Sequence, residues 1–425
     1  MSKFITVKLN ELAAPGRSVI SGPFGSNIGQ RFFKTHGVPV IRGNNLTTDF
    51  KKFNDDGFVF LTEEKADELK ADAIKGDILF TAAGTIGQVG MIPQSAKYDR
   101  YVISNKQLRF RVDPTKADPN YVYYWLASPW IYKTIIDRNT GSTVPLINLG
   151  IIKSLPVSLP KDIVEQKKIS RVLANIDEKI ALNNHINTEL QAMAKTLYDY
   201  WFVQFDFPDA NGKPYKTSGG KMEYNATLKR EIPAGWRSLR LNELLQNCTN
   251  STVTGAFDSD LPYTPIDALP MKKMSFGDAY SSDRANTSLI KYKKNDILIG
   301  AMRVYFHRVC IAPFDGITRT TTLVLRPNKE EFLPYIYQVC NEEKTIGIAA
   351  KISVGTQQPY VNWENSLENL AIAYPEDDSL IQRYSSAMVD LVKEVISGEK
   401  ENSKLKKLRD WLLPLLMNGQ VTVKK

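Results

Sequence analysis

The chain has 425 residues, of which 43% are hydrophobic and 24% are charged, so it is long enough for two or three globular domains and falls outside the disordered and fibrous classes. Lysine and arginine total 55 against 46 aspartate and glutamate residues, and the net charge of +9 fits a polyanionic partner and a solvated basic surface equally well. There is no apolar run that could span a membrane and no signal-peptide pattern, so we expect a cytoplasmic protein. The three cysteines are too far apart in sequence to form a disulfide framework or a zinc motif.

Short strands and turns dominate the first 160 residues. Segments 37–46, 76–92 and 101–112 carry alternating apolar or β-branched residues punctuated by Gly and Asn, a pattern typical of β-strands. Segment 117–136 indicates a helical hairpin, and the proline-containing segment 154–160 indicates one more strand. This part of the chain is therefore predicted to be an α+β domain.

The segment 162–205 is the longest helical signal in the chain, with neither Gly nor Pro inside it. Its apolar residues recur at three- and four-residue steps on both sides of a polar break, and they are Ile169, Val172, Leu173, Ile176 and Ile180, then Ile186, Leu190, Met193 and Leu197. The pattern predicts one apolar stripe along the helix. Such a helix would be roughly 60 Å long, so we expect it to connect two bodies.

The second half of the chain follows the same order. Segment 207–236 is rich in Gly, Pro, Lys and Asn and is predicted to be a linker. Strands are expected within 295–313 and 369–375, and a helical hairpin within 331–350. A second long helix is predicted over 378–418, with apolar residues Ile381, Tyr384, Met388, Leu391 and Val395, then Leu405, Leu408, Leu412 and Leu415.

Three short segments occur twice, in the same order. LNEL at 9–12 recurs at 241–244, KGDILF at 75–80 recurs as KNDILI at 294–299, and GSTVPLIN at 141–148 recurs as GTQQPYVN at 355–362. The offset between the copies falls from 232 to 219 to 214 residues. Collinear matches with a drifting offset predict one fold used twice with loops of different length.

These segments resemble the DNA-specificity (S) subunits of type I restriction-modification enzymes. The resemblance is carried by SGPFGS (21–26), GVPVIRGNNL (37–46), GDILFTAAGTIGQVG (76–90), STVPLINLGIIKSLPVSLP (142–160), EQKKIS (165–170) and LRDWLLPLLMNGQV (408–421). The second half departs from the family pattern at 247–258, which reads NCTNSTVTGAFD where GPFGS would be expected.

The resemblance implies an α+β fold in which two similar mixed α/β target-recognition domains are joined by two long, antiparallel, coiled-coil-like helices in a pseudo-two-fold repeat. Residues 1–160 would then form target-recognition domain 1, residues 161–206 the first long helix and residues 207–235 a linker. Residues 236–375 would form target-recognition domain 2, and residues 376–425 the second long helix with the C-terminal tail.

The resemblance also implies a function without catalysis. Each domain would read one half of a split, asymmetric target in double-stranded DNA, and the two helices would fix the spacer between the halves. The implied partners are two methyltransferase (M) subunits, which bind S-adenosylmethionine and methylate adenine, and restriction (R) subunits, which use ATP. The outer faces of the helices would dock the methyltransferase subunits, and this chain would bind no cofactor and no metal.

Base edges and phosphates are contacted by Arg, Lys, Asn, Gln and hydroxyl side chains, and polar loops flanked by glycine are the places to look for them. In the first half the predicted DNA-binding residues are Arg42, Asn44, Asn45, Thr85, Asn139, Ser142 and Thr143. In the second half they are Arg303, Tyr305, His307, Lys351, Thr356, Gln357 and Gln358. The alternative for each residue is an ordinary exposed polar side chain or a satisfied turn.

Polar residues interrupt both long helices near their middles, at 183–187 and 397–402. Antiparallel pairing would bring these two polar belts together, and buried polar residues can fix register at some cost in stability. We predict that Asn183 and Asn187 set the register of the helix pair, with solvated stretches as the alternative for the second belt.

Two other functions remain as alternatives: a protein-interaction scaffold without DNA binding, and a self-contained DNA methyltransferase. The tetrapeptide DLPY at 260–263 resembles the loop in which amino-methyltransferases hold a flipped base, but no glycine-rich motif for S-adenosylmethionine accompanies it. The glycines of GTIGQVG (84–90) are interpreted as a turn between strands. The histidines lie far apart in sequence, so no catalytic triad is predicted.

Overall fold

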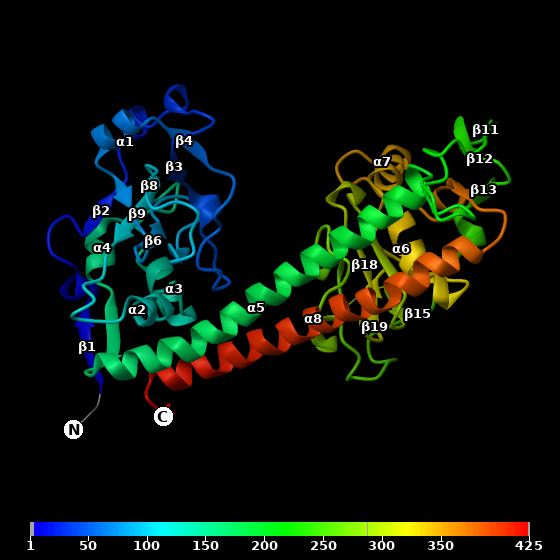
Figure 1. Cartoon of the computed structure of the whole chain (residues 1–425). Helices are drawn as coiled ribbons and strands as arrows, with labels where there is room; N and C mark the ends of the chain where they lie inside the picture. The colour runs from blue at the N-terminus through cyan, green and yellow to red at the C-terminus, as the bar shows by residue number, and fades with distance from the viewer. Residues whose placement is uncertain (1–3, 287, 424–425) are drawn as a thin grey trace. The chain divides into compact units, whose positions relative to one another are not determined.

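The computed structural model describes residues 4–286 and 288–423. The chain divides into two compact units, which Figure 1 shows coloured from the N-terminus to the C-terminus. The first unit holds the chain up to Lys179 together with Leu405 onward, and the second holds Ile180–Lys404. Each unit combines β-sheets, short helices and a stretch of both long helices, which confirms the α+β fold class.

The first unit contains two four-stranded sheets, a two-stranded ladder and four short helices. In spatial order the first sheet is β2 (Val19–Ser21), β9 (Gln107–Phe110), β6 (Ile78–Thr81) and β7 (Val89–Met91), and the second is β4 (Val59–Leu61), β3 (Val38–Ile41), β8 (Tyr101–Ile103) and β5 (Asp72–Ala73). The ladder joins β1 (Phe4–Lys8) to β10 (Pro156–Pro160). The helices are α1 (Glu63–Leu69), α2 (Pro119–Leu126), α3 (Pro129–Asp137) and α4 (Leu149–Lys153).

The second unit repeats this plan with a three-stranded sheet in place of one of the four-stranded sheets. Its sheets are β14 (Leu245–Asn247), β20 (Thr322–Pro327), β17 (Ile297–Gly300) and β18 (Val309–Ile311), and β15 (Ser251–Thr252), β16 (Leu289–Tyr292) and β19 (Gly316–Arg319). The ladder joins β13 (Arg237–Arg240) to β21 (Ala371–Tyr374), and the short helices are α6 (Leu333–Asn341) and α7 (Glu343–Ile352). The segment predicted as a linker also contains an antiparallel hairpin, β11 (Met222–Asn225) with β12 (Arg230–Pro233).

The repeated motifs occupy equivalent places. In each unit the ladder strand nearest the start runs into LNEL, which forms the 3-10 turns Leu9–Leu12 and Leu241–Glu243. KGDILF and KNDILI form β6 and β17, the central strands of the two equivalent sheets. The internal repeat read from the sequence is therefore a repeat of three-dimensional structure.

A buried carboxylate precedes each central strand. Asp77 and Asp296 are both 1% exposed. Asp77 accepts a bidentate pair of hydrogen bonds from Arg111 at 2.7 and 2.8 Å, and Asp296 accepts the same pair from Arg326 at 2.7 and 2.8 Å. The equivalent ion pair thus ties the turn before the central strand to the neighbouring strand in both units.

Removal of either carboxylate is expected to destabilise the protein. Asp77→Ala or Asp296→Ala leaves a partly buried arginine without its partner, and we expect a loss of about 2–4 kcal/mol of unfolding free energy, measured by chemical denaturation. Asp99→Ala is the matched control because the Asp99 side chain is 95% exposed. An equally large loss in the control would show that the effect does not come from the buried pair.

The long helices are α5 (Ile163–Tyr198) and α8 (Ser379–Met417), and α5 continues into a π-helical turn, Asp199–Val203. Aspartates cap both helices: Asp162 Oδ1 accepts from Val164 N at 2.8 Å, and Asp377 Oδ1 accepts from Ser379 N at 2.8 Å. Carboxylates at these positions also suit the positive end of the helix dipole.

The two helices pack antiparallel within each unit (Figure 1). In the first unit Arg409 Nη1 donates to Asp177 Oδ1 at 2.9 Å, and Leu173 of α5 shares a core with Leu413 of α8. In the second unit Tyr384 Oη of α8 donates to the carbonyl oxygen of Ala194 on α5 at 2.9 Å. The predicted antiparallel helix pair is confirmed.

The predicted apolar stripe is buried in the first half of each helix, as Leu173 of α5 and Tyr384 of α8 show, but the prediction is wrong in the second half. On α5 the buried seam runs from Leu173 and Ile180 through Asn183 and Asn187 to Ala194, whereas Ile186 and Met193 are 43% and 61% exposed on another face. On α8 Leu408 is 43% exposed, and Leu413 and Leu416 are buried instead. The seam continues as polar and small residues because the partner helix supplies matching groups there.

Candidate nucleic-acid interface

Two polar loops lie against each other in the first unit. The 82–88 turn connects β6 to β7, and the 139–146 loop follows α3. Gly84 N donates to Pro145 O at 2.9 Å, and Ile147 N donates to Ala82 O at 2.8 Å. These bonds place Thr85 and the predicted residues of the 139–146 loop in neighbouring loops.

The second unit builds the same arrangement from its 301–308 turn, between β17 and β18, and its 353–360 loop, which follows α7. Arg303 N donates to Pro359 O at 2.7 Å, and Val361 N donates to Ala301 O at 3.0 Å. These two bonds match those of the first unit position by position. Both units therefore present the same pair of loops, with different side chains on them.

Both turns contain backbone positions with positive φ angles. Gly84 and Gly87 have φ angles of +87° and +92°, and Arg303 and His307 have φ angles of +52° and +54°. Glycine adopts positive φ without strain, whereas other residues are disfavoured there by about 1 kcal/mol or more. Non-glycine residues held in this region are found preferentially at functional sites.

The predicted residues of the first unit divide into exposed and supporting side chains. Thr85, Ser142 and Thr143 are exposed. Asn139 is exposed too, but its Oδ1 accepts from Gly141 N at 2.9 Å and from Leu146 N at 2.8 Å. Asn139 therefore shapes the loop that carries Ser142 and Thr143.

Arg42, Asn44 and Asn45 form a neighbouring turn. Asn44 is exposed, and Arg42 is half-buried with Nη2 donating to Gly57 O at 2.9 Å. Asn45 is fully buried, and its amide bonds to Asn54 O at 2.8 Å and to Asp56 O at 3.0 Å. The Asn45 side chain is thus occupied in holding the turn.

In the second unit Lys351, Thr356, Gln357 and Gln358 are exposed, and Tyr305 is 53% exposed. Arg303 is half-buried, and its Nη2 donates to Gln357 O at 3.2 Å. His307 is only 4% exposed, and its Nε2 lies 2.8 Å from Asn341 Oδ1. His307 therefore anchors the 301–308 turn from inside.

Two residues at this interface were not predicted from the sequence. Gln88 Nε2 donates to Leu46 O at 3.1 Å and so joins the 82–88 turn to the turn that carries Arg42 and Asn44. Phe306 is 41% exposed and forms an edge-on ring pair with Tyr305, with centroids 5.1 Å apart. Exposed adjacent aromatics can stack on bases or contact thymine methyl groups. The aromatic pair YF inside a polar loop was the signal available in the sequence.

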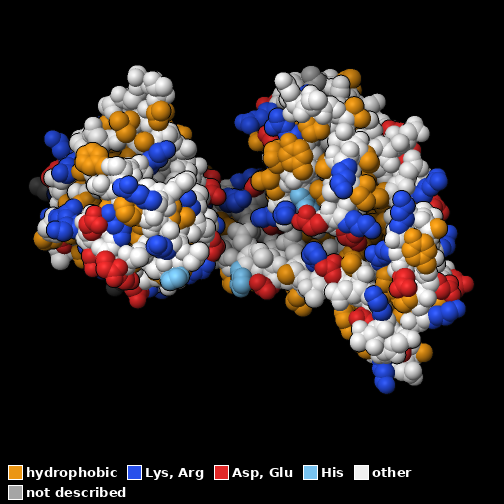
Figure 2. Space-filling view, turned by 90° about the horizontal axis from the view of Figure 1, so that it is seen from above, with side chains coloured by type: hydrophobic (Ala, Val, Ile, Leu, Met, Phe, Trp, Pro, Cys, Tyr) orange, Lys and Arg blue, Asp and Glu red, His pale blue; other side chains and the backbone are white. Residues whose placement is uncertain are grey.

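Charge is distributed over the surface of both units. On the face seen in Figure 2, lysine and arginine side chains are interspersed with aspartate and glutamate. A mixed surface of this kind leaves recognition to particular loops.

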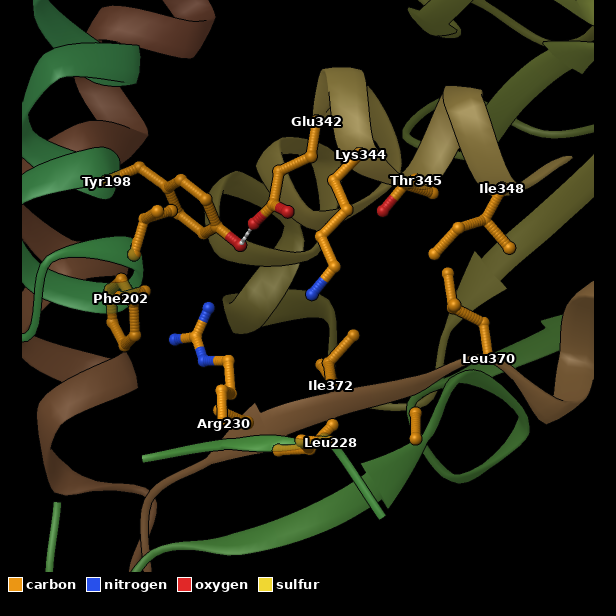
Figure 3. A pocket seen from close by; sticks show the side chains of 13 residues that line it. Tyr198, Phe202, Leu228, Arg230, Glu342, Lys344, Thr345, Ile348, Leu370 and Ile372 are labelled. Carbon is orange, nitrogen blue, oxygen red and sulfur yellow. Dashed lines mark hydrogen bonds between the residues drawn. The ribbon is translucent and has the colours of Figure 1, made fainter. Parts of the chain in front are cut away.

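The second unit also has a cavity of about 110 Å³ away from these loops (Figure 3). Tyr198 at the end of α5 donates a hydrogen bond to Glu342 at the start of α7, and burial raises the pKa of Glu342. Arg230 and Lys344 reach into the same cavity, and the Arg230 guanidinium lies 4.5 Å from the Phe205 ring centroid. No residue of the 301–308 turn or the 353–360 loop lines this cavity.

The segments weighed as enzymatic motifs have structural roles. Tyr263 of the DLPY segment is 5% exposed and pairs through its backbone with Tyr280, so its ring lies in the core. Among residues 4–286 and 288–423, no cluster of His, Cys, Asp and Glu could hold a metal ion. In the same part of the chain no helix is both long and apolar enough to cross a membrane.

Comparison with known proteins gives a consistent picture. Residues 28–192 match the model of the type I restriction modification DNA specificity domain. The chain is 25% identical over 367 residues to the type I restriction enzyme MjaIX specificity subunit of Methanocaldococcus jannaschii, covering 83% of this chain and 79% of that one. It is 22% identical over 410 residues to the HindI specificity subunit of Haemophilus influenzae, covering 82% and 87%.

The fold is also shared with a solved structure. The type I restriction-modification S subunit from M. genitalium superposes with a TM-score of 0.56 at 17% identity, over 97% of this chain and 96% of that one. The duplicated α+β domain combined with two long antiparallel helices is thus a fold that this chain shares with that S subunit. Along more than three quarters of its length the chain is thus similar to specificity (S) subunits of type I restriction-modification systems.

Proposed function

We propose that the chain reads a bipartite, asymmetric DNA target in the cytoplasm, with one recognition domain for each half. The observation that carries this proposal is the duplicated loop pair, since the bonds Gly84–Pro145 and Arg303–Pro359 occupy equivalent positions. Equivalent scaffolds with different exposed side chains are suited to reading two different short sequences by the same geometry.

The contacting side chains are those that the structure leaves exposed or half-buried. In the first unit they are Arg42, Asn44, Thr85, Ser142 and Thr143, and in the second Arg303, Tyr305, Phe306, Lys351, Thr356, Gln357 and Gln358. Asn45, Asn139 and His307 support these loops from within. The lysine and arginine side chains serve phosphate contacts, and the amide and hydroxyl side chains serve base edges.

The helix pair sets the spacer between the two half-sites. Its register is fixed by a buried polar belt in the second unit, where Asn183 and Asn187 are 5% and 3% exposed. Asn183 Nδ2 donates to Asn402 Oδ1 at 3.1 Å, and Asn187 Nδ2 donates to Glu399 Oε1 at 3.3 Å. The observed register gives both amides a partner, which is how buried polar residues can select one pairing of two helices.

The decisive experiment maps methylated adenines in DNA from cells that carry this chain and its methyltransferase partner. Two short motifs separated by a fixed, unspecified gap are the expected result. The binding of the assembled complex to DNA should also fall steeply between low and moderate salt because phosphate contacts release counterions. The absence of DNA binding by the assembled complex would favour a protein-interaction scaffold.

The methyltransferase subunits dock on the exposed apolar faces of the helices. In the second unit Leu182, Ile186 and Met193 are 52%, 43% and 61% exposed on α5, at spacings that place them on one face. An apolar stripe on a helix that is open to solvent is a site for a partner surface. R subunits complete the assembly through the M subunits and this chain.

Substitution of this face tests the docking. Ile186→Asp and Met193→Asp are each expected to weaken assembly with the methyltransferase subunits by about 10- to 100-fold. Each variant places a charge where the complex would bury an apolar side chain. Thr188→Asp, on another face of α5, is the control. Analytical ultracentrifugation measures the assembly, and unchanged affinity with both variants would place the docking surface elsewhere.

A further inference from the structure

Each unit contains a short segment that lies between the helix pair and a four-stranded sheet, which is β2-β9-β6-β7 in the first unit and β14-β20-β17-β18 in the second. We name residues 49–53 the first strap and residues 271–277 the second strap. Lys52 O accepts from Met91 N at 2.8 Å, and Met274 O accepts from Ile311 N at 2.7 Å. Met91 pairs with Ile78 and Ile311 pairs with Ile297, which are equivalent positions of the repeat, so the two straps cover the same strand edge.

The straps also share an unusual backbone conformation. Phe50 lies two residues before Lys52 and has a φ of +63°, and Lys272 lies two residues before Met274 and has a φ of +54°. Neither residue is glycine, so each conformation is disfavoured unless the surroundings impose it. The same strain at the same position of two diverged units points to a shared requirement for the strap's path.

Contacts with both helices hold the first strap. Arg409 of α8 donates from Nη1 to Asp49 O at 3.3 Å, and its guanidinium lies 4.4 Å from the Phe50 ring centroid. The same nitrogen bonds to Asp177 of α5, whose Oδ2 accepts from Tyr124 Oη at 2.6 Å. Burial is the largest influence on Asp177 and raises its pKa. Arg409 thus links the first strap to the seam of the helix pair.

Different residues hold the second strap to the same helix pair. Gln191 Oε1 of α5 accepts from Met274 N at 2.6 Å, and Lys273 Nζ donates to Glu399 Oε1 at 3.3 Å. Gly277 packs so tightly on α8 that a Cβ atom there would lie 2.0 Å from Glu399 O. Glu399 is also the acceptor for Asn187, so the second strap is bonded directly to the polar belt.

The straps reach the recognition turns as well. Lys272 N donates to His307 O at 2.8 Å, at the residue that closes the 301–308 turn. In the first unit Leu46, just before the strap, accepts from Gln88 of the 82–88 turn at 3.1 Å. In the second unit hydrogen bonds therefore run from the helix pair through the strap to the 301–308 turn, and in the first unit the strap follows three residues after Leu46, which is bonded to the 82–88 turn.

We propose that the two straps orient each recognition domain on the helix pair, and that Gln191 and Arg409 are positioning residues for spacer length. The proposal rests on the proposed DNA-reading function and adds a second determinant of the spacer beside helix register. Register fixes how α5 and α8 pair, whereas the straps fix how each recognition domain sits on that pair. Loss of a strap bond then changes the spacing between half-sites without changing which bases each half reads.

The test uses the full chain assembled with its methyltransferase subunits and adenine-methylation mapping. Gln191→Leu removes the acceptor for Met274 N and the bond from Gln191 Nε2 to Asn187 O, whereas Gln191→Glu loses the second bond but keeps the acceptor oxygen, so it controls for that loss. Gln382→Leu, at an exposed position of α8, is the matched control. Gln191→Leu is expected to raise methylation at sites whose spacer differs by one base pair by about two- to tenfold relative to native-spacer sites, the range of one hydrogen bond. Gln191→Glu and the control should keep the native spacer.

The spacer length of the methylated DNA motif distinguishes a folding defect from a positioning defect. A uniform fall in methylation with unchanged spacer preference for Gln191→Leu would overturn the proposal. The first strap is tested with the double variant Asp177→Asn, Arg409→Met, which removes the ion pair without leaving a buried charge alone, and it should relax the spacer in the same way. A wild-type complex that yields no bipartite motif would instead refute the proposed function.

Discussion

Replacing Gln357 and Gln358 with alanine is expected to relax base discrimination in one half of the DNA target by about 5- to 100-fold. Both side chains are exposed on the 353–360 loop, whose backbone is held to the 301–308 turn by the bond from Arg303 N to Pro359 O at 2.7 Å. Glutamine can bond two edges of one base, and the loss of a base contact costs about 1–3 kcal/mol. Binding selection from randomised DNA measures the effect for each half separately.

The equivalent change in the other unit provides the comparison. The double variant Ser142→Ala, Thr143→Ala should relax base discrimination in the half of the target that the first unit reads. Discrimination in the half that the second unit reads should stay unchanged. Gln382→Ala, on an exposed face of α8, should alter neither half. If both halves lost discrimination together in either variant, the assignment of one half to each unit would be wrong.

The second large effect is expected at the polar belt. Asn183→Leu removes the amide that donates to Asn402 Oδ1 at 3.1 Å, and Asn402 is only 2% exposed. A buried polar group without a partner costs about 1–3 kcal/mol, so the unfolding free energy should fall by that amount. Spacer discrimination should also weaken, because an apolar seam admits neighbouring registers.

The double variant Asn183→Leu, Asn402→Leu separates stability from register. Replacing both members of a buried polar pair with apolar residues is often neutral, so stability should return to within about 1 kcal/mol of the original value. Spacer discrimination should remain weak in the double variant. Recovery of both properties together would show that the polar belt stabilises the helix pair without setting its register.

Much of the architecture follows from the sequence because it depends on repeated local patterns. The motif KGDI and its copy KNDI lead into equivalent central strands, and each contains the aspartate that an arginine in or just after the neighbouring strand binds, Asp77 with Arg111 and Asp296 with Arg326. The long helices follow from apolar periodicity on both sides of a polar break and from the aspartates that cap them. These signals are local, so they can be interpreted without knowing how the elements pack in the tertiary structure.

The phase of the buried seam does not follow from the sequence in the same way. Ile186 and Met193 continue the apolar rhythm of α5, yet they are exposed, while Asn183 and Ala194 are buried. The partner helix decides this, because Asn402 satisfies the Asn183 amide and Tyr384 bonds to the carbonyl oxygen of Ala194. Apolar periodicity indicates that a helix has an apolar stripe. Only the pairing of α5 with α8 decides which residues of the helix are buried.

The candidate site also combines features that the sequence predicts with features that only the tertiary structure decides. Loop composition alone predicts polar residues on these turns, but it cannot separate Gln357, which is exposed, from His307, whose ring is buried against Asn341. The difference depends on hydrogen-bond partners that lie in other segments. Asn45 belongs with His307 for this reason, since its amide is consumed by Asn54 and Asp56.

The sequence by itself determined that this chain is a duplicated α+β protein with two capped long helices and polar loops in both units, because repeats, caps and periodicity depend on neighbouring residues. The tertiary structure decided which side chains remain free to meet DNA, which helix faces remain open to a partner, and how the straps tie each sheet to the helices. Phe50 and Lys272 are the clearest example, since each adopts a positive φ angle that no local signal indicates. Their conformation is imposed by contacts with a strand edge and a helix pair that lie far away in the sequence.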